Sequence, residues 1–425
     1  MPPAFTFVDL FAGCGGFSLG LSDVGGTGLI AIEKSESAFD SLARNLGPKG
    51  HKPTFVWPSW FNVEAAEIGS FWHRHSADLK RMRGTVDVLA GGPPCQGFST
   101  YGRRNRDDER NGLYLDYLRV VEAIQPTVVL LENVQGIDMP FIVSGQKTGK
   151  HCRKTVAARI EEKLTALGYQ THVLKLCASN FGVPQRRIRF IMLAVRTTRG
   201  LFDKKIFSDE FFSAVRHEHL ARFGLREASR VTSSQALSDL ECARTTLIPC
   251  VDAARRFQVE YLGPKTQYQR QMRLNMSKSA QPSSMRLARH SDAVIAKFEL
   301  IQRLVEPDMP VGESVRAQLK SAKFRTYLLS KATPSATVTT LPDDLVHYSE
   351  PRILSVRECA RLQSFPDWFD FSGPYTTGGE RRRLEVPRYS QVGNAVPPRL
   401  GSFLGAYAKA ILKHLEHPNS LSLAA

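Results

Sequence analysis

Short apolar segments that alternate with longer amphipathic ones fill the first 200 residues, and this rhythm constrains the fold most strongly. Five segments are apolar enough for buried strands, at residues 7–11, 29–33, 86–90, 128–131 and 190–195. Helix-like segments lie between them, at residues 37–45, 114–124 and 155–167. Strands that alternate with helices favour a parallel sheet, and unbroken apolar runs indicate strands covered on both faces. The predicted fold class is therefore α/β, with a doubly wound, mostly parallel sheet.

The alternation stops near residue 196, and the chain up to about residue 330 cannot be assigned to strands and helices. That stretch is rich in serine and arginine, and residues 261–291 contain no acidic side chain. Regular patterns return near residues 337–340, and helices are expected over residues 355–363 and 398–414. The chain therefore has a regular first part, a less regular middle and a regular C-terminal part.

The net charge points to a class of partner. The 425 residues include 57 Lys and Arg against 41 Asp and Glu, which gives a formal net charge of +16. Hydrophobic residues make up 42% of the chain, enough for a sizeable core, so a disordered polycation is excluded. A globular chain with an excess of positive charge favours a polyanionic partner, most simply a nucleic acid.

Other classes of protein are disfavoured by what the sequence lacks. No run approaches the roughly 20 apolar residues of a membrane-spanning helix, and residues 1–6 lack the features of a secretion signal. We therefore expect a cytoplasmic protein without a membrane partner. The seven cysteines are widely spaced and form no C-x-x-C pair, so we expect neither a disulfide framework nor a bound metal.

A glycine-rich turn follows the first predicted strand. Residues 9–18 read Asp-Leu-Phe-Ala-Gly-Cys-Gly-Gly-Phe-Ser, and a strand that feeds such a turn lets the backbone approach a ligand closely. Glu33 ends the next strand, where a carboxylate can accept hydrogen bonds from ribose hydroxyls. Together these features favour nucleotide binding; the alternative is a tight strand-to-helix turn that binds nothing.

A cysteine follows the third predicted strand, in the segment Gly-Gly-Pro-Pro-Cys-Gln-Gly-Phe-Ser at residues 91–99. Ligand sites of open α/β sheets lie at the carboxyl ends of the strands, and two prolines stiffen the loop that carries Cys95. Cys95 is thus placed as a nucleophile would be, with a helix N-terminus or an arginine needed to stabilise its thiolate. The alternative is an inert buried thiol.

Charged side chains mark two further strand ends. Glu132 closes the fourth predicted strand and is a candidate to hold a substrate by a ring nitrogen and an exocyclic amine; the alternative is a helix-cap partner. Arg187 and Arg189 lead into the fifth predicted strand and share one face of an extended segment. Arginine suits bidentate contacts with carbonyl and phosphate oxygens, whereas the alternative is a basic strand edge that guards against aggregation.

Taken together and in this order, these blocks resemble the DNA (cytosine-5) methyltransferase family, of the bacterial and phage restriction-modification type. The resemblance covers residues 5–200 and about 335–415. The blocks that carry it are Pro94-Cys95-Gln96, Glu132-Asn133-Val134, Gln185-Arg186-Arg187-Ile188-Arg189 and Gly393-Asn394-Ala395-Val396-Pro397-Pro398.

The resemblance implies a division of the chain into two domains. Residues 1–205 would form the first part of a catalytic domain that binds S-adenosylmethionine, and residues 336–425 would return to complete it. Residues 206–335 would be a smaller, inserted target-recognition domain, with DNA in the cleft between the two. The basic, acid-free window then becomes a candidate DNA contact. The DNA-contacting residues predicted there and in the loop after Cys95 are Lys265, Arg270, Arg273, Arg103, Arg104 and Arg106.

The resemblance also implies roles for single residues. Cys95 matches the nucleophile, and Glu132, Arg187 and Arg189 match the groups that hold the target cytosine and orient the cysteine loop. The positions that match cofactor contacts are Phe11, Gly13, Gly16, Glu33, Asn62, Val63, Gly92, Pro94, Asn394 and Ala395. Two departures stand out: Asn62-Val63 is the nearest match to an acidic–aliphatic pair that meets the adenine, and Lys34 stands where an aromatic residue often covers it.

The implied activity is transfer of a methyl group from S-adenosylmethionine to C5 of a cytosine that is flipped out of a specific duplex site, through a covalent adduct between Cys95 and C6. The expected partners are double-stranded DNA and a cognate restriction endonuclease acting on the same site, and a monomer is expected. Two alternatives stay open from the sequence: methylation of tRNA, and a catalytically inactive DNA-binding regulator. Gln96 matches the DNA-directed form.

Overall fold

The computed structural model describes residues 3–94, 112–139, 154–197, 202–244, 246–321, 323–376 and 385–417. Two groups of predicted site residues lie outside these ranges: the nucleophile candidate, and the three arginines that follow it in the same loop. They are Cys95, Arg103, Arg104 and Arg106.

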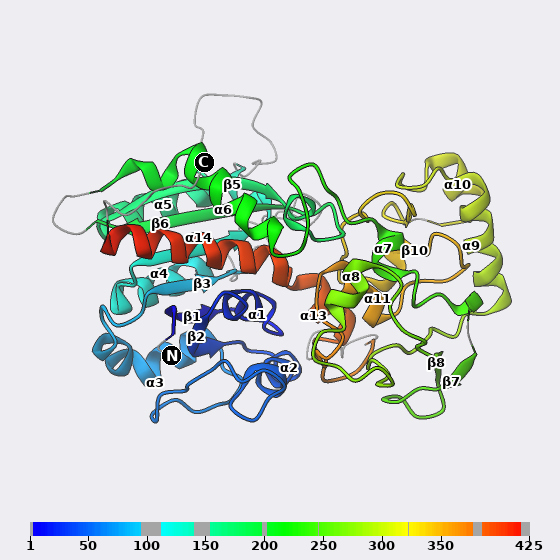
Figure 1. Cartoon of the computed structure of the whole chain (residues 1–425), viewed down its shortest axis with the longest axis horizontal. Helices are drawn as coiled ribbons and strands as arrows, with labels where there is room; N and C mark the ends of the chain where they lie inside the picture. Colours follow the sequence, from blue (N-terminus) through cyan, green and yellow to red (C-terminus); the bar gives the residue numbers. More distant parts are fainter. Residues whose placement is uncertain are drawn as a thin grey trace, which may run out of the picture.

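One six-stranded sheet organises the first half of the chain (Figure 1). Its strands are β1 (Phe5–Leu10), β2 (Gly26–Ile32), β3 (Val88–Gly91), β4 (Val128–Asn133), β5 (Tyr169–Cys177) and β6 (Ile188–Arg196). They lie side by side in the order β2-β1-β3-β4-β6-β5. The first four are parallel, whereas β6 runs antiparallel to both of its neighbours. This confirms the predicted mostly parallel α/β sheet.

Helices cover both faces of this sheet, as the unbroken apolar strands required. Alternate residues of β1 face opposite ways, so Phe7 and Val8 belong to two separate apolar clusters. The cluster of Phe7 packs against α1 (Gly16–Ser22), α2 (Glu36–Leu46) and α14 (Pro398–Glu416). The cluster of Val8 packs against α3 (Ile68–Arg81), α4 (Leu113–Ile124) and α5 (Val156–Ala166). Within the described ranges, no helix is both long and apolar enough to cross a bilayer.

The C-terminal helix completes the sheet domain. Helix α14, red in Figure 1, packs along α1 with the backbones in close contact. A Cβ added to Gly20 would lie 2.5 Å from the carbonyl oxygen of Pro398 and from the amide nitrogen of Ser402, so only glycine fits this crossing. Glycine therefore allows a segment almost 400 residues later in the chain to cover this face.

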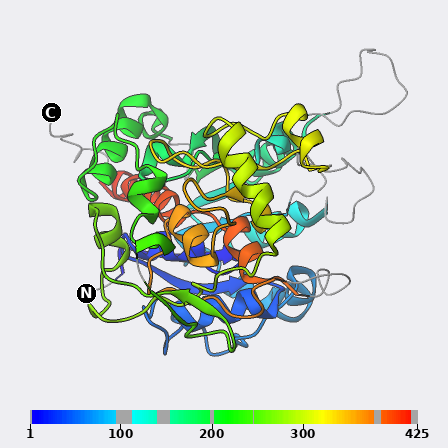
Figure 2. The same ribbon diagram turned by 90° about the vertical axis from the view of Figure 1, so that its right-hand side faces the viewer.

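Most of the middle of the chain folds beside the sheet domain, on the right of Figure 1 and toward the viewer in Figure 2, whereas its first helix lies against the sheet domain. Its helices are α6 (Asp209–Ala221), α7 (Ser233–Leu237), α8 (Gln267–Met272), α9 (Asp292–Leu304) and α10 (Glu313–Gln318). Strand β7 (Leu247–Pro249) pairs antiparallel with β8 (Phe257–Val259), and β9 (Tyr327–Leu328) pairs parallel with β10 (Leu345–Val346). Helices α11 (Val356–Leu362) and α13 (Arg388–Asn394) follow. Helix α6 packs on α14. The exact boundaries between the two domains stay a prediction.

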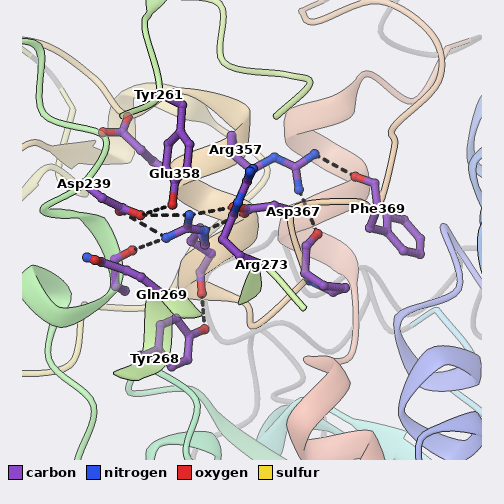
Figure 3. Close-up of polar contacts among 12 residues, drawn as sticks. Asp239, Tyr261, Tyr268, Gln269, Arg273, Arg357, Glu358, Asp367 and Phe369 are labelled. Atoms are coloured by element: carbon purple, nitrogen blue, oxygen red, sulfur yellow. Dashed lines mark hydrogen bonds and ion pairs between the residues drawn. The ribbon is translucent and has the colours of Figure 1, made fainter. Parts of the chain in front are cut away.

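A buried guanidinium ties α11 to the middle region (Figure 3). Arg361 has no exposed surface and donates to both oxygens of Asp239, at 3.2 and 3.1 Å, and to both oxygens of Asp367. The hydroxyl of Tyr261 donates to Asp239 at 2.9 Å, and the hydroxyl of Tyr268 donates to the carbonyl oxygen of Arg361. A buried charge needs such full pairing, so residues from both parts of the chain depend on this one contact.

Candidate functional site

A cavity of about 860 Å³ lies at the carboxyl ends of β1, β2, β3 and β4. Parallel strands end at the same edge of a sheet, which is why residues far apart in sequence meet there. Most of the predicted catalytic and cofactor residues line it. They are Phe11, Gly13, Glu33, Gly92, Pro94, Glu132, Arg187, Arg189, Asn394 and Ala395.

The glycine-rich turn forms one wall of the cavity. Its backbone is held in the left-handed region at Phe11 (φ 59°), Gly13 (φ 56°) and Gly15 (φ 91°), and such a conformation is costly for a bulky residue such as Phe11. No atom lies within 4 Å of the place where a Cβ of Gly13 would be, so the turn leaves an open cradle beside the cavity. A ligand can thus come close to this backbone.

Glu33 closes this wall. One of its carboxylate oxygens accepts a hydrogen bond from the amide of Gly13 at 3.0 Å, and the other accepts from the amide of Ser35 at 2.8 Å. Burial raises the pKa of the Glu33 carboxyl, and these two amides oppose the rise. Each oxygen has acceptor capacity left for a hydroxyl donor in the cavity.

Two of the predicted cofactor positions, Gly16 and the pair Asn62-Val63, do not line the cavity. A Cβ on Gly16 would lie 2.4 Å from the carbonyl oxygen of Val396, so this glycine serves close packing of α1 against the C-terminal segment. Asn62 and Val63 are exposed, Val63 by 49%, and they lie on a turn that precedes α3. The cofactor roles of these residues stay predictions, and none of the three lines the cavity.

The acidic–aliphatic pair at the cavity is Glu67-Ile68. The amide of the preceding Ala66 donates to the carbonyl oxygen of Glu33 at 2.8 Å, which holds this segment beside the end of β2. The signal was present in the sequence, because Glu67-Ile68 has the expected residue types just before a helical pattern.

Glu132 and Arg189 form an ion pair in the cavity. The guanidinium Nε of Arg189 lies 2.8 Å from a carboxylate oxygen of Glu132, and both side chains are about nine-tenths buried. Gly92 packs against this carboxylate, since a Cβ there would lie 3.1 Å from its other oxygen. The side-chain amide of Asn133 donates to the carbonyl oxygen of Pro93 at 2.9 Å. The described segment that leads to residue 95 is therefore held against the end of β4.

Arg187 lines the same cavity, and within the described part of the chain its hydrogen bonds go to backbone carbonyl oxygens. It donates to the carbonyl oxygens of Val338 at 3.0 Å, Gly393 at 2.8 Å and Ala395 at 3.3 Å. Burial lowers the pKa of this guanidinium well below its ordinary value, with a further contribution from Arg189. Arg187 thus fixes two C-terminal segments against β6.

The three described residues predicted to contact DNA do not behave alike. Lys265 and Arg270 are exposed, and neither lines the cavity. Arg273 is buried: it donates to the carbonyl oxygens of Ser277 and Ala280 and lies 4.4 Å from the ring centre of Tyr261. The DNA contact of Arg273 stays a prediction, and its guanidinium is used within the fold.

Sequence reasoning missed several residues that line the cavity. Residues 336–340 run along it, as do Arg325 and Tyr327 from the middle region. For residues 336–340, the sequence indicated only that regular patterns of secondary structure return near residue 337. Asp9 lines the cavity beneath the turn and accepts from the Ser18 hydroxyl at 2.6 Å, while burial raises its pKa to about 7. A carboxylate inside a strand was a signal that could have been used.

A comparison with family models decides what kind of protein carries this site. The model described as C-5 cytosine-specific DNA methylase matches residues 5–412. The chain belongs to the C-5 cytosine-specific DNA methylases. The methylase is therefore an enzyme that methylates DNA on C5 of cytosine, as the resemblance of its ordered blocks implied.

Curated relatives match the methylase over nearly its whole length. It is 28% identical to type II methyltransferase M.DdeI of Desulfomicrobium norvegicum, covering 98% of this chain and 90% of the relative. It is 29% identical to type II methyltransferase M.AgeI of Thalassovita gelatinovora, covering 95% of this chain and 99% of the relative. A crystal structure of a prophage-encoded E. coli protein, described as a DNA modification methyltransferase, matches the fold with a TM-score of 0.66 at 21% identity, over 97% of this chain and 100% of that one.

Proposed function

We propose that this methylase transfers a methyl group from S-adenosylmethionine to C5 of a cytosine flipped out of a specific duplex site, and that Cys95 is its nucleophile. The observation that carries the proposal is the buried Glu132–Arg189 ion pair, which lies at the strand end that holds the segment leading to residue 95. A cytosine seated there would meet a carboxylate, a guanidinium and a thiol.

The glycine-rich wall fits the cofactor. A nucleoside needs a close backbone approach and a carboxylate for its ribose hydroxyls, and the open cradle at Gly13 beside Glu33 supplies both. We assign Glu67 and Ile68, together with Phe11, to the adenine end of the site, because all three line the cavity and Ala66, which precedes Glu67, is bonded to the backbone of Glu33. When bound, S-adenosylmethionine supplies a methyl group on a sulfonium that leaves as a neutral thioether.

The proposed chemistry assigns a separate task to each side chain. The thiolate of Cys95 adds to C6 of the cytosine, and the ring electrons make C5 nucleophilic as Glu132 binds N3 and the 4-amino group. Arg189 orients the Glu132 carboxylate through its 2.8 Å contact. After C5 takes the methyl group, its proton leaves to water, and elimination breaks the bond between sulfur and C6 and releases Cys95.

The cytosine must leave the base stack to reach this cavity, at a cost of a few kcal/mol. We propose duplex DNA as the substrate, in the cytoplasm, and a restriction endonuclease of the same specificity as the partner in the cell. The type II methyltransferases among the relatives support that assignment.

A duplex that contains 5-fluorocytosine tests the mechanism, because fluorine at C5 cannot leave as a proton. With S-adenosylmethionine present, the methylase should become covalently attached to this duplex, and Cys95→Ser should abolish both the adduct and the methylation. Cys250→Ser is a matched control that should keep both, since Cys250 is not in the cavity. Methylation of tRNA in place of DNA, or DNA binding without any methylation, would contradict the proposal.

A further inference from the structure

Only a small part of the described middle region reaches the cavity. The described residues of this region that line it are Arg325 and Tyr327, and Arg186 lines the same cavity. A residue of this region that borders the cavity lies close to the nucleotide that enters it. Residues 323–327 are therefore the candidates in this region for contacts with the DNA around the target base.

This segment belongs to a small ribbon of paired backbone, which is formed by residues 308–311, 326–328 and 345–346. The carbonyl oxygen of Leu328 accepts from the amide of Asp308 at 2.7 Å, and that of Thr326 accepts from the amide of Val311 at 2.8 Å. On its other side, β9 pairs with β10. Asp308 also pairs with Arg186 at 3.2 Å, which joins the ribbon to the approach of β6. The position of residues 323–327 relative to the cavity is therefore fixed by several independent contacts.

The segment presents an aromatic ring to solvent. Phe324 is 73% exposed, the highest exposure among the large hydrophobic residues of the described chain. The guanidinium of Arg316 lies 4.0 Å from its ring centre, which holds the ring in place. Lys323, next to it, is paired with Asp343 at 2.6 Å and Asp344 at 2.7 Å. A single exposed ring is common on protein surfaces, and what sets Phe324 apart is its place next to Arg325, which lines the cavity.

Duplex DNA is the partner that fits, given the proposed function on which this step rests. Arginine binds the N7 and O6 atoms of guanine with two hydrogen bonds, and phenylalanine packs against base edges such as the thymine methyl group. We infer that Phe324 and Arg325 contact the base pairs that flank the target cytosine and set part of the target specificity of this methylase.

The test compares target sites rather than overall activity. The recognition sequence of the wild-type enzyme is first determined by bisulfite sequencing, and kcat/KM is then measured on that site and on sites with one flanking base pair changed. Phe324→Ala and Arg325→Ala should each reduce discrimination at one or two flanking positions, by about 5- to 150-fold for the arginine. Arg325→Lys should not restore it, because an ammonium lacks the two-pronged geometry.

Two matched variants serve as controls. Phe257→Ala removes another exposed phenylalanine of the same region, which lies in β8 and outside residues 323–327, and Arg81→Ala removes an exposed arginine of α3, at the far end of the molecule in Figure 1. Both should keep the recognition sequence. Thermal unfolding and S-adenosylmethionine binding check that each variant is folded, with Phe324→Leu as the milder substitute.

Two results would overturn the inference. Unchanged discrimination in both alanine variants would mean that residues 324 and 325 do not read bases. A uniform loss on all sites that Arg325→Lys restores would mean a phosphate contact without sequence reading. Absence of methylation by the wild-type enzyme would instead refute the proposed function, so the two failures are distinct.

Discussion

Among the described residues, Glu132 has one ionic partner in the cavity, Arg189, and the pair is almost fully buried. We predict that Glu132→Gln lowers kcat by about 10²- to 10³-fold, because a carboxyl group can deliver a proton to N3 as negative charge develops on the cytosine ring during thiolate addition, and an amide cannot. The affinity for S-adenosylmethionine, measured by calorimetry, should change little. A stopped-flow or single-turnover assay isolates the chemical step.

Glu64→Gln is the matched control for that variant. Glu64 pairs with Arg74 at 3.1 Å on the surface, where both side chains are about half exposed. Exposed pairs of this kind contribute little, so we expect wild-type kcat. If Glu132→Gln also kept wild-type kcat, Glu132 would have no role in the reaction.

Single residues at strand ends could be predicted from the sequence, and residues placed by tertiary contacts could not. Glu33 and Glu132 end parallel strands, so their meeting at one edge follows from the fold class alone. Val338 lines the cavity because Arg187 holds its carbonyl oxygen, a contact across 151 positions that no local pattern reveals. Arg273 is a second example. The absence of acidic residues around it in the sequence does not indicate whether its guanidinium is buried, and in the structure it is.

At the scale of elements, the crossing of α1 and α14 depends on one missing side chain. We predict that Gly20→Ala destabilises the methylase by several kcal/mol, because the added Cβ would lie 2.5 Å from the backbone of α14 and the two helices would have to separate. Gly69 is the matched control: it lies in α3, and no atom is within 4 Å of its would-be Cβ.

Gly69→Ala should stabilise the protein by about 0.5–1 kcal/mol through helix propensity alone. Urea unfolding measures both changes. Equal effects of the two substitutions would show that helix propensity, and not the close crossing, governs Gly20.

Elements with a clear apolar period were predicted, and those without one were missed. Strand β5 was overlooked because it is a sheet edge with Gln170, Val173 and Lys175 toward solvent, so its pattern is mixed. The elements of the middle region are short and take their places from contacts such as that of Arg361 with Asp239. Propensity alone cannot locate strands as short as β9.

The stability of the whole molecule should depend on pH through two buried histidines. Burial lowers the pKa of His347 to about 4 and that of His219 to about 3. Both stay neutral in the folded protein, whereas the unfolded chain takes up protons near pH 6.5. Between pH 6.5 and 4 the unfolded state therefore binds more protons, and the free energy of unfolding falls as the pH falls. Asp9, with its pKa raised to about 7, opposes this by binding a proton in the folded state.

We predict that His347→Gln flattens this pH dependence, with a fall between pH 6.5 and 5 that is smaller by about 1–2 kcal/mol than in the wild type. Urea unfolding at several pH values measures the slope. His51→Gln, at a half-exposed surface position, should leave the slope unchanged. A wild-type slope in His347→Gln would mean that His347 accepts its proton in the folded state.

The close contact of α1 with α14 also has a consequence for how the protein is made. Phe17 and Leu21 belong to an apolar cluster that includes Phe403 and Leu404 of the last helix. Helix α14 leaves the ribosome almost 400 residues after α1, so the part of this face that α14 covers stays exposed while the residues between them are synthesised. We therefore expect a chaperone, or a transient collapsed state of the growing chain, to protect this face until α14 is made. A circular permutant that begins with α14 would supply the cover first and should fold with less aggregation.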